Sequence, residues 1–300
     1  RDPEMSRGLG DVYKRQTYNR AYIIKKLYDS LCKQSCRSFE WLIVDDGSTD
    51  NTKEVIDEFM EIATFSIRYF YQENSGKHIA INRGVRESKG ELFFIVDSDD
   101  YLSEMAVERI QSDYKAIIGD TTFCGLSYLR AYHDGKAIGG EVNYSTLDCN
   151  LLDYKLRYKI KGDKAEIYKT EILKEYPFPQ YTGERFCPEA LVFNRIALKY
   201  KLRHINAKIY YCEYLPDGLT AKIVKVRMDC VQASLAYYRE LYQMDIPYTQ
   251  KVKTAINYCR FALCAPCDKW KLFFKYPQLG IIVYPIAICL HVRDLARVTE

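Results

Sequence analysis

Two short apolar runs, each ending in a cluster of aspartates, constrain the fold of this chain more than any other feature. Residues Trp41–Val44 and Leu92–Val96 are continuous apolar runs, as expected of parallel strands that are buried on both faces. Asp45-Asp46-Gly47-Ser48 follows the first run, and Asp97-Ser98-Asp99-Asp100 follows the second. Ligands of open α/β sheets bind beyond the carboxyl ends of the strands. We therefore expect both acidic clusters to face a ligand.

The rest of the pattern predicts a two-part chain. Apolar residues at helical spacing, or capping signals, predict five helices in the first part of the chain: after Asn19, from Thr49 or Asp50 to about Ile62, at 78–87, around Val107 and at 188–200. Further strands are predicted at 67–71, 121–128, 164–168 and 208–214. After Thr220 only helices are expected, at 226–242, 249–263, 268–274 and 279–298. This order predicts an α/β fold whose doubly wound, Rossmann-like nucleotide-binding sheet spans residues 17–215, with a C-terminal helical extension over 216–300.

Residues 1–16 look foreign to this pattern. They are polar and without periodicity, and residues 11–16 match an in-frame translation of a transposon adapter used in sequencing libraries. We expect a non-native tail that forms no strand, so that the first strand of the sheet is missing. A natural disordered tail is the alternative.

Charge and cysteine content exclude several classes of protein. A net charge of +4 spread along the chain does not favour nucleic acid as a partner. Eleven cysteines form no even, regularly spaced framework, which favours reduced thiols in a cytoplasmic setting. A dinucleotide-binding GxGxxG motif and a P-loop are both missing from the sequence. The 12-residue apolar run from Leu279 to Leu290 is too short to span a bilayer, although it predicts either a packed helix or peripheral membrane contact.

Asp97 and Asp99 form an Asp-x-Asp triplet after the second apolar run. Two carboxylates in such a turn can hold Mn²⁺ or Mg²⁺, which prefer oxygen ligands. A metal held there would bridge the phosphates of a nucleoside diphosphate. The triplet alone is a weak signal, and its position after a buried strand strengthens it.

Four ordered motifs resemble those of family 2 glycosyltransferases with the GT-A fold. They are Thr17-Tyr18-Asn19-Arg20, Val44 to Asp50, Asn74 to Gly84 and Val96 to Asp100, and the resemblance runs from Thr17 to about Tyr214. It implies an inverting enzyme that transfers a sugar from a nucleotide-diphosphate sugar, usually UDP-linked, to a glycan or lipid-linked acceptor in bacterial surface polysaccharide synthesis. The family has a strand and a proline directly before Thr17, where this chain has Gln16.

The resemblance also implies roles for single residues. Donor-binding positions are Thr17, Tyr18, Asp45, Asp46, Lys77, His78, Asn82 and Asp97. Within this set, Tyr18 would stack on the nucleobase, Asp46 would accept a hydrogen bond from it, and Lys77 would neutralise phosphate charge. Asp97 and Asp99 would form the Mn²⁺ or Mg²⁺ site.

Glu189 matches the family's catalytic base at the start of a helix. A first-turn acid without catalytic function is the alternative, and the family more often has an aspartate there. Glu184 and Arg185 lie directly before this helix. They either contact the acceptor or donor, or are solvated residues without such a function. A non-catalytic binder of nucleotide sugars is a further alternative, against which both Asp99 and Glu189 argue.

Overall fold

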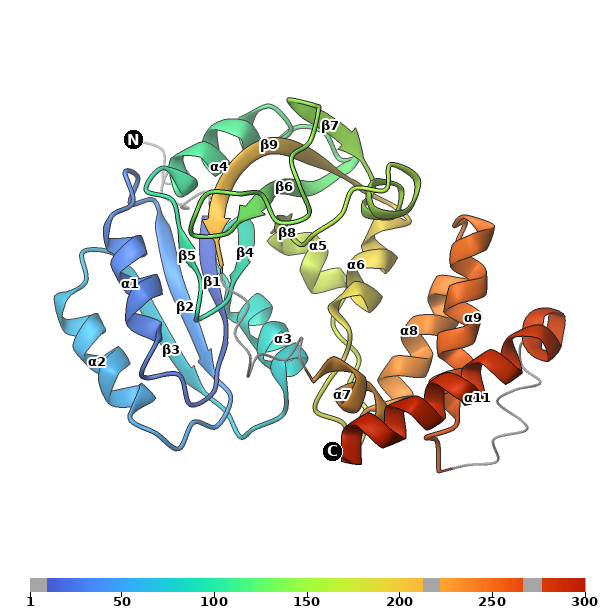
Figure 1. Cartoon of the computed structure of the whole chain (residues 1–300). Coiled ribbons are helices and arrows are strands. Elements are labelled where there is room, and N and C mark those ends of the chain that lie inside the picture. Colours follow the sequence, from blue (N-terminus) through green and yellow to red (C-terminus); the bar gives the residue numbers. More distant parts are fainter. Residues whose placement is uncertain (1–9, 213–221, 267–276, 300) are drawn as a thin grey trace. The chain divides into compact units, whose positions relative to one another are not determined.

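A mixed sheet runs through the first part of the structure, a computed structural model that describes residues 10–212, 222–266 and 277–299 (Figure 1). The strands lie in the order β3-β2-β1-β4-β8-β6-β9-β5, and β7 pairs with β9. Strands β3, β2, β1 and β4 are parallel, whereas β8 is antiparallel to both β4 and β6. The bounds are β1 (Gly10–Thr17), β2 (Phe39–Asp45), β3 (Ser66–Tyr71), β4 (Leu92–Val96), β5 (Tyr101–Leu102), β6 (Phe123–Ala131), β7 (Thr146–Cys149), β8 (Lys164–Lys169) and β9 (Lys201–Tyr211).

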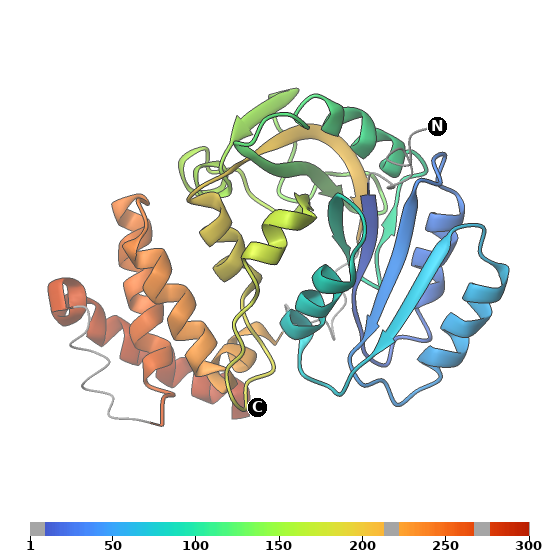
Figure 2. The same ribbon diagram turned by 180° about the vertical axis from the view of Figure 1, so that it is seen from behind.

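Helices cover both faces of the parallel strands. Figures 1 and 2 show α1 and α2 on one face and α3 on the other. The bounds are α1 (Ile24–Cys32), α2 (Thr52–Ile62), α3 (Lys77–Glu87), α4 (Ala106–Lys115) and α5 (Thr170–Glu175). Trp41 of β2 is fully buried beside Tyr28 and Phe59, whose rings stack 4.0 Å apart. Aromatic pairs of this kind add about 0.5–1.5 kcal/mol beyond the area that they bury. This packing holds β2, the strand that leads into the first acidic cluster.

The prediction that residues 1–16 form no strand is wrong. Gly10–Thr17 forms β1, which pairs in parallel with both β2 and β4, so that Val12 has Trp41 on one side and Phe94 on the other. The hydrogen bonds between neighbouring strands join backbone N–H and C=O groups, and every residue other than proline has both groups. The place between β2 and β4 therefore accepts a proline-free segment even when its side chains show no strand pattern. The foreign origin of residues 1–16 stays a prediction.

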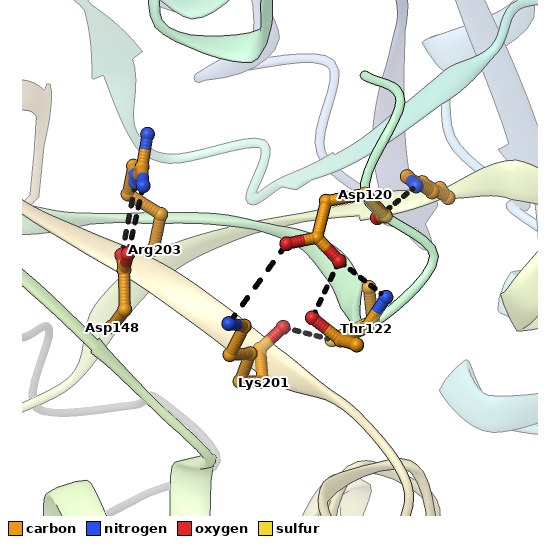
Figure 3. Close-up of polar contacts among 7 residues, drawn as sticks. Asp120, Thr122, Asp148, Lys201 and Arg203 are labelled. Carbon is orange, nitrogen blue, oxygen red and sulfur yellow. Dashed lines mark hydrogen bonds and ion pairs between the residues drawn. The ribbon is translucent and has the colours of Figure 1, made fainter. Parts of the chain in front are cut away.

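The second half of the sheet departs more from the expected pattern. The short strands β5 and β7, helix α5 and a π-helical turn at Asp153–Arg157 were not expected, and β9 begins at Lys201 rather than at about 208. The start of β9 is mostly polar, with Leu202 and Ile205 as its apolar residues, so the apolar run that marks a buried strand begins only later. Figure 3 shows the ion pairs that hold this region, in which Arg203 forks onto Asp148 of β7 and Lys201 approaches Asp120.

The chain folds as two compact units. The first comprises Arg1–Lys155, Lys159–Pro177 and Ile196–Glu213, and it contains the sheet. The second comprises Leu156–Tyr158, Phe178–Arg195 and Tyr214–Glu300. The domain boundary predicted after residue 215 falls within residues 213–221, which lie outside the described part, as does the helix expected at 268–274.

The second unit is helical. Its helices are most of α6 (Glu189–Ala197), then α7 (Ile223–Asp229), α8 (Val231–Gln243), α9 (Tyr248–Ala262) and α11 (Pro277–Thr299). The single helix expected at 226–242 is therefore two helices, which meet at Cys230.

Helix α11 packs one face against α9. Val283 and Ala287 are buried in a cluster with Ala255, Tyr258 and Ala262, which lie on α9, and the buried Asp294 pairs with Arg260. Other apolar side chains of α11 remain exposed. None of the helices in the described ranges is both long and apolar enough to cross a membrane.

Candidate active site

Two loops at the carboxyl ends of β1 and β2 are tied together by Asn19. Its amide oxygen accepts the backbone N–H of Thr49 at 2.8 Å, and its own backbone N–H donates to the Ser48 hydroxyl at 2.9 Å. Asn19 has a φ of 52°, in the left-handed region that asparagine tolerates better than most residues. The sequence pattern indicated that Asn19 caps the first helix. Instead, Asn19 joins the two loops, and the N-cap residue of α1 is Ile23.

Tyr18 lies beside this junction, and Thr17 ends the adjoining strand. Thr17 is fully buried, and its carbonyl oxygen accepts the backbone N–H of Asp46 at 2.9 Å. Tyr18 is 45% exposed, so a large part of its surface is open to a stacking partner. The stacking role stays a prediction.

Asp45 and Asp46 are buried and hold the loops around them. One oxygen of Asp45 accepts the backbone N–H of Ser48 at 2.8 Å, and the other accepts the Tyr69 hydroxyl at 2.7 Å. Asp46 accepts the side-chain amide of Gln72 at 2.7 Å and the backbone N–H groups of Ser75 and Gly76, both at 2.9 Å. These contacts give both carboxylates a structural function that the sequence did not reveal. Their predicted contact with the nucleotide is not tested.

The loop held by Asp46 leads directly into α3. Gly47 has a φ of +87°, and a Cβ there would lie 2.8 Å from the backbone nitrogen of Asn74, so the two loops touch at a residue without a side chain. At the start of α3, Lys77 is half-buried and His78 is buried, and Asn82 is half-buried one turn further on. Burial lowers the pKa of His78 to about 4. His78 is therefore neutral at neutral pH and cannot add positive charge for a phosphate, which leaves Lys77 as the cation in the first turn of α3.

The acidic turn after β4 is backed by two residues from distant strands. The Tyr210 hydroxyl accepts the backbone N–H of Asp97 at 2.9 Å and donates to the buried Asp100 at 2.5 Å. Arg130 lies 3.6 Å from the Asp97 carboxylate, and its guanidinium stacks over the Tyr210 ring at 4.2 Å. Arg130 and Tyr210 are register partners on β6 and β9.

Charge crowding in this turn is strong. Burial and the nearby negative charges of Asp97 and Asp99 raise the pKa of Asp100 to about 8, although the hydrogen bond from Tyr210 opposes the rise. Asp97 and Asp99 remain half-buried, with part of their surface exposed. Two partly exposed carboxylates beside a third that resists ionisation suit a divalent cation, which would relieve the repulsion.

The described residues hold no complete metal site. Within them, no group of three or more His, Cys, Asp or Glu side chains is arranged to bind a metal ion. Divalent cations in nucleotide sites commonly take one or two carboxylates and complete their shell with phosphate and water oxygens. Asp97 and Asp99 fit that smaller requirement.

Glu189 lies in the second unit. It is the first residue of α6 and is half-buried, in the first turn where a carboxylate is favoured by the helix dipole. The predicted donor residues thus belong to the first unit, and the candidate base belongs to the second. The catalytic role of Glu189 stays a prediction.

Several residues of the site were missed by the sequence analysis. Arg130 and Tyr210 lie far from the acidic turn in sequence, on strands whose pairing no local pattern indicates. Gln72 and Ser75 are common loop residues, and only their hydrogen bonds to Asp46 distinguish them. The spacing of the acidic clusters alone would not have found any of the four.

Comparisons with known proteins agree with this architecture. The model of the family described as glycosyl transferase family 2 matches residues 16–165. A glycosyltransferase of Rickettsia typhi is 35% identical over 282 residues, covering 82% of this chain and 86% of that protein. Against six other curated glycosyltransferases the chain spans between 14% and 67% of their length.

Two solved structures show the same fold at low identity. The crystal structure of Staphylococcus aureus TarS matches with a TM-score of 0.63 and 19% identity, over 96% of this chain and 53% of that chain. The mannosyltransferase PcManGT of Pyrobaculum calidifontis, in complex with GDP-Man and Mn²⁺, matches with a TM-score of 0.55 and 17% identity, over 100% of this chain and 82% of that chain. The predicted fold of GT-A type is thereby confirmed, and the chain belongs to glycosyl transferase family 2.

Proposed function

We propose that the chain is an inverting glycosyltransferase that takes a sugar from a UDP-linked donor. The observation that carries this proposal is the acidic turn after β4, where Asp97 and Asp99 stay partly exposed while Tyr210 and Arg130 hold the turn from behind. Such a turn at the end of a buried strand suits a nucleoside diphosphate. The Mn²⁺ in the PcManGT complex and the UDP in a TarS complex support the same donor chemistry.

The donor would lie against the loops of the first unit. The Tyr18 ring would stack on the nucleobase, and the buried loop network around Asp46 would hold that pocket in shape. Lys77 would place positive charge near the diphosphate. A divalent cation held by Asp97 and Asp99 would neutralise the charge on the departing diphosphate.

Glu189 would serve as the general base. Its carboxylate would accept the proton of the acceptor hydroxyl while that oxygen bonds to the anomeric carbon, and the bond from this carbon to the diphosphate would break. Attack from the face opposite the leaving group inverts the anomeric centre. The proposed metal ligands belong to the first unit, and the proposed base belongs to the second.

The acceptor would be a glycan or a lipid-linked sugar in surface polysaccharide synthesis. TarS is named a poly(ribitol-phosphate) β-N-acetylglucosaminyltransferase and is 26% identical over 162 residues, which cover 53% of this chain and 27% of that protein. We place the chain in the cytoplasm, with peripheral contact to the inner face of the plasma membrane through α11. Exposed Ile288, Val292 and Leu295 share one stripe of that helix, which would supply the apolar contact with the membrane.

A panel of donors with a base variant tests the proposal. UDP-glucose, UDP-galactose, UDP-N-acetylglucosamine and GDP-mannose are each incubated with Mn²⁺, and release of the nucleoside diphosphate by hydrolysis is measured. Glu189→Gln should lower the fastest of these rates by about 10²–10⁴-fold, the usual contribution of a general base. Calorimetry should show that Glu189→Gln binds UDP with the same affinity as the wild type. A rate near that of the wild type would move the base to another residue, and no Mn²⁺-dependent release from any donor would contradict the proposed activity.

A further inference from the structure

The loop before α6 is held by the start of α8. The Glu184 carboxylate accepts the backbone N–H of Gln232 at 2.6 Å and that of Ala233 at 2.9 Å. Both groups belong to the first turn of α8, where backbone N–H groups have no partner within the helix. The N-cap residue of α8, Cys230, supplies no side-chain hydrogen bond of its own. Glu184 therefore caps α8 from a distant segment, and its negative charge is favoured at that helix end.

A second contact joins α6 itself to α8. The Arg195 guanidinium donates two parallel hydrogen bonds, both 2.7 Å long, to the two oxygens of Glu240. Both side chains are about two thirds or more buried, and the bonds to Glu240 raise the pKa of Arg195. A forked pair of this kind fixes orientation as well as distance. It ties the last turn of α6 to the last turn of α8.

The Cys230 thiol at the start of α8 is buried, and burial raises its pKa, which the backbone groups of Arg185 and Phe186 oppose. The loop is therefore held at Glu184, and the helix that follows is held at Arg195. Glu189 lies between these contacts, so its backbone position depends on α8 from both sides.

We propose that Glu184, Arg195 and Glu240 are positioning residues for Glu189. Through them, α8 serves as the scaffold that orients the first turn of α6 for deprotonation of the acceptor. The inference rests on the proposed role of Glu189 as the base. A misplacement of about 1 Å can lower a catalytic rate by about 10²-fold, so contacts that never touch the substrate still set the rate. The C-terminal helices are then part of the catalytic apparatus.

Single variants of the full chain give the first test. Glu184→Gln and Glu240→Gln each remove one charge from the contacts with α8. The assay uses the donor that the wild type hydrolyses fastest in the presence of Mn²⁺. Each variant should lower this hydrolysis rate by about 10-fold or more, which is less than the roughly 10²-fold loss expected when a catalytic group is displaced by about 1 Å. The UDP affinity measured by calorimetry should stay within about twofold, because the donor residues belong to the first unit.

The first unit offers a matched control. Arg203 forks onto Asp148 with bonds of 2.9 and 2.7 Å, and the exposure of this pair, 24% and 33%, resembles that of Arg195 and Glu240, 32% and 23% (Figure 3). Asp148→Asn should leave the hydrolysis rate unchanged. An equal loss of rate in Asp148→Asn and Glu240→Gln would overturn the proposal, since any broken ion pair would then have the same effect.

Double variants separate positioning from general damage. In a Glu189→Gln background, Glu184→Gln and Glu240→Gln should lower the residual rate by less than about twofold, because residues that act through one group are not additive. Equal losses in both backgrounds would show that these residues do not act through Glu189. If Glu189→Gln alone keeps the wild-type rate, the base assignment fails instead. The reversed pair Arg195→Glu with Glu240→Arg should recover most of the rate lost in Glu240→Gln, and no recovery would also contradict the proposal.

Discussion

The two units hold their charged residues in different ways. In the first unit, Asp45 and Asp46 accept backbone N–H groups from the loops that follow neighbouring strands. In the second, Glu184 before Glu189 and Arg195 after it reach a helix that begins more than 30 residues later. The first arrangement follows from strand order, since adjacent parallel strands deliver their loops to one edge of the sheet. The second depends on a carboxylate that caps a distant helix and on one pair of side chains, Arg195 and Glu240.

This difference has a consequence for mutation. A carboxylate that accepts backbone N–H groups can be replaced by few other side chains, because the donors stay in place when it is lost. An ion pair between side chains can be replaced by another pair of matching charge. We therefore expect Asp45, Asp46 and Glu184, which accept backbone N–H groups, to tolerate less change than the pair of Arg195 and Glu240.

The largest expected effect is the loss of metal-dependent donor binding in Asp99→Ala. The cation would lose a direct carboxylate ligand, so the affinity for UDP in the presence of Mn²⁺ should fall by about 10²-fold or more. Loss of a residue that only hydrogen-bonds to a metal ligand already lowers metal affinity by about 10–100-fold, and loss of the ligand itself should cost at least as much. Calorimetry with UDP, with Mn²⁺ and with EDTA, measures this. Glu189→Gln is the control from the second unit and should bind UDP as the wild type does. Unchanged Mn²⁺-dependent affinity in Asp99→Ala would remove the metal assignment.

Asp46→Asn should destabilise the first unit by about 2–3 kcal/mol. The new amide group would face three N–H donors, from Gln72, Ser75 and Gly76, in a fully buried place, and bonds to a charged acceptor contribute about 1.5–3 kcal/mol each. Urea denaturation gives the free energy of unfolding.

Asp57→Asn is the matched control for that change. Asp57 pairs with Lys53 on the exposed surface of α2, and such pairs contribute about 0.3–0.5 kcal/mol. Similar small losses for both variants would show that the Asp46 network does not stabilise the loops.

The strands that carry the acidic turns were largely predictable from local sequence. Buried strands that end in acidic turns identified β2, β4 and the positions of Asp46 and Asp97, because a strand followed by a polar turn is a short-range pattern. The edge at which these turns meet then follows from parallel topology alone. Strand β1 was mispredicted because its pairing uses backbone groups only, and its side chains carry no strand signal.

The remaining features depend on long-range contacts that no window of sequence contains. Tyr210 reaches Asp97 across 113 positions, and Glu184 reaches Gln232 across 48. The sequence left Glu184 between a ligand contact and a solvated residue, and neither description fits a carboxylate that caps α8. Such contacts are visible only once the topology is known.

The smallest expected effect concerns the exposed apolar stripe of α11 in the second unit. Ile288, Val292 and Leu295 are 46–59% exposed and recur at helical spacing, whereas Val283 and Ala287 pack against α9. Val292→Ser with Leu295→Ser should lower partition onto phosphatidylglycerol vesicles about fivefold, since each side chain would lose part of the roughly 1.5–3 kcal/mol of full burial. Met60→Ser with Ile62→Ser removes comparable exposed apolar area from α2 and should leave flotation unchanged. Flotation that is equal in the wild type and both variants would assign α11 to the core of the second unit alone, with no contact to lipid.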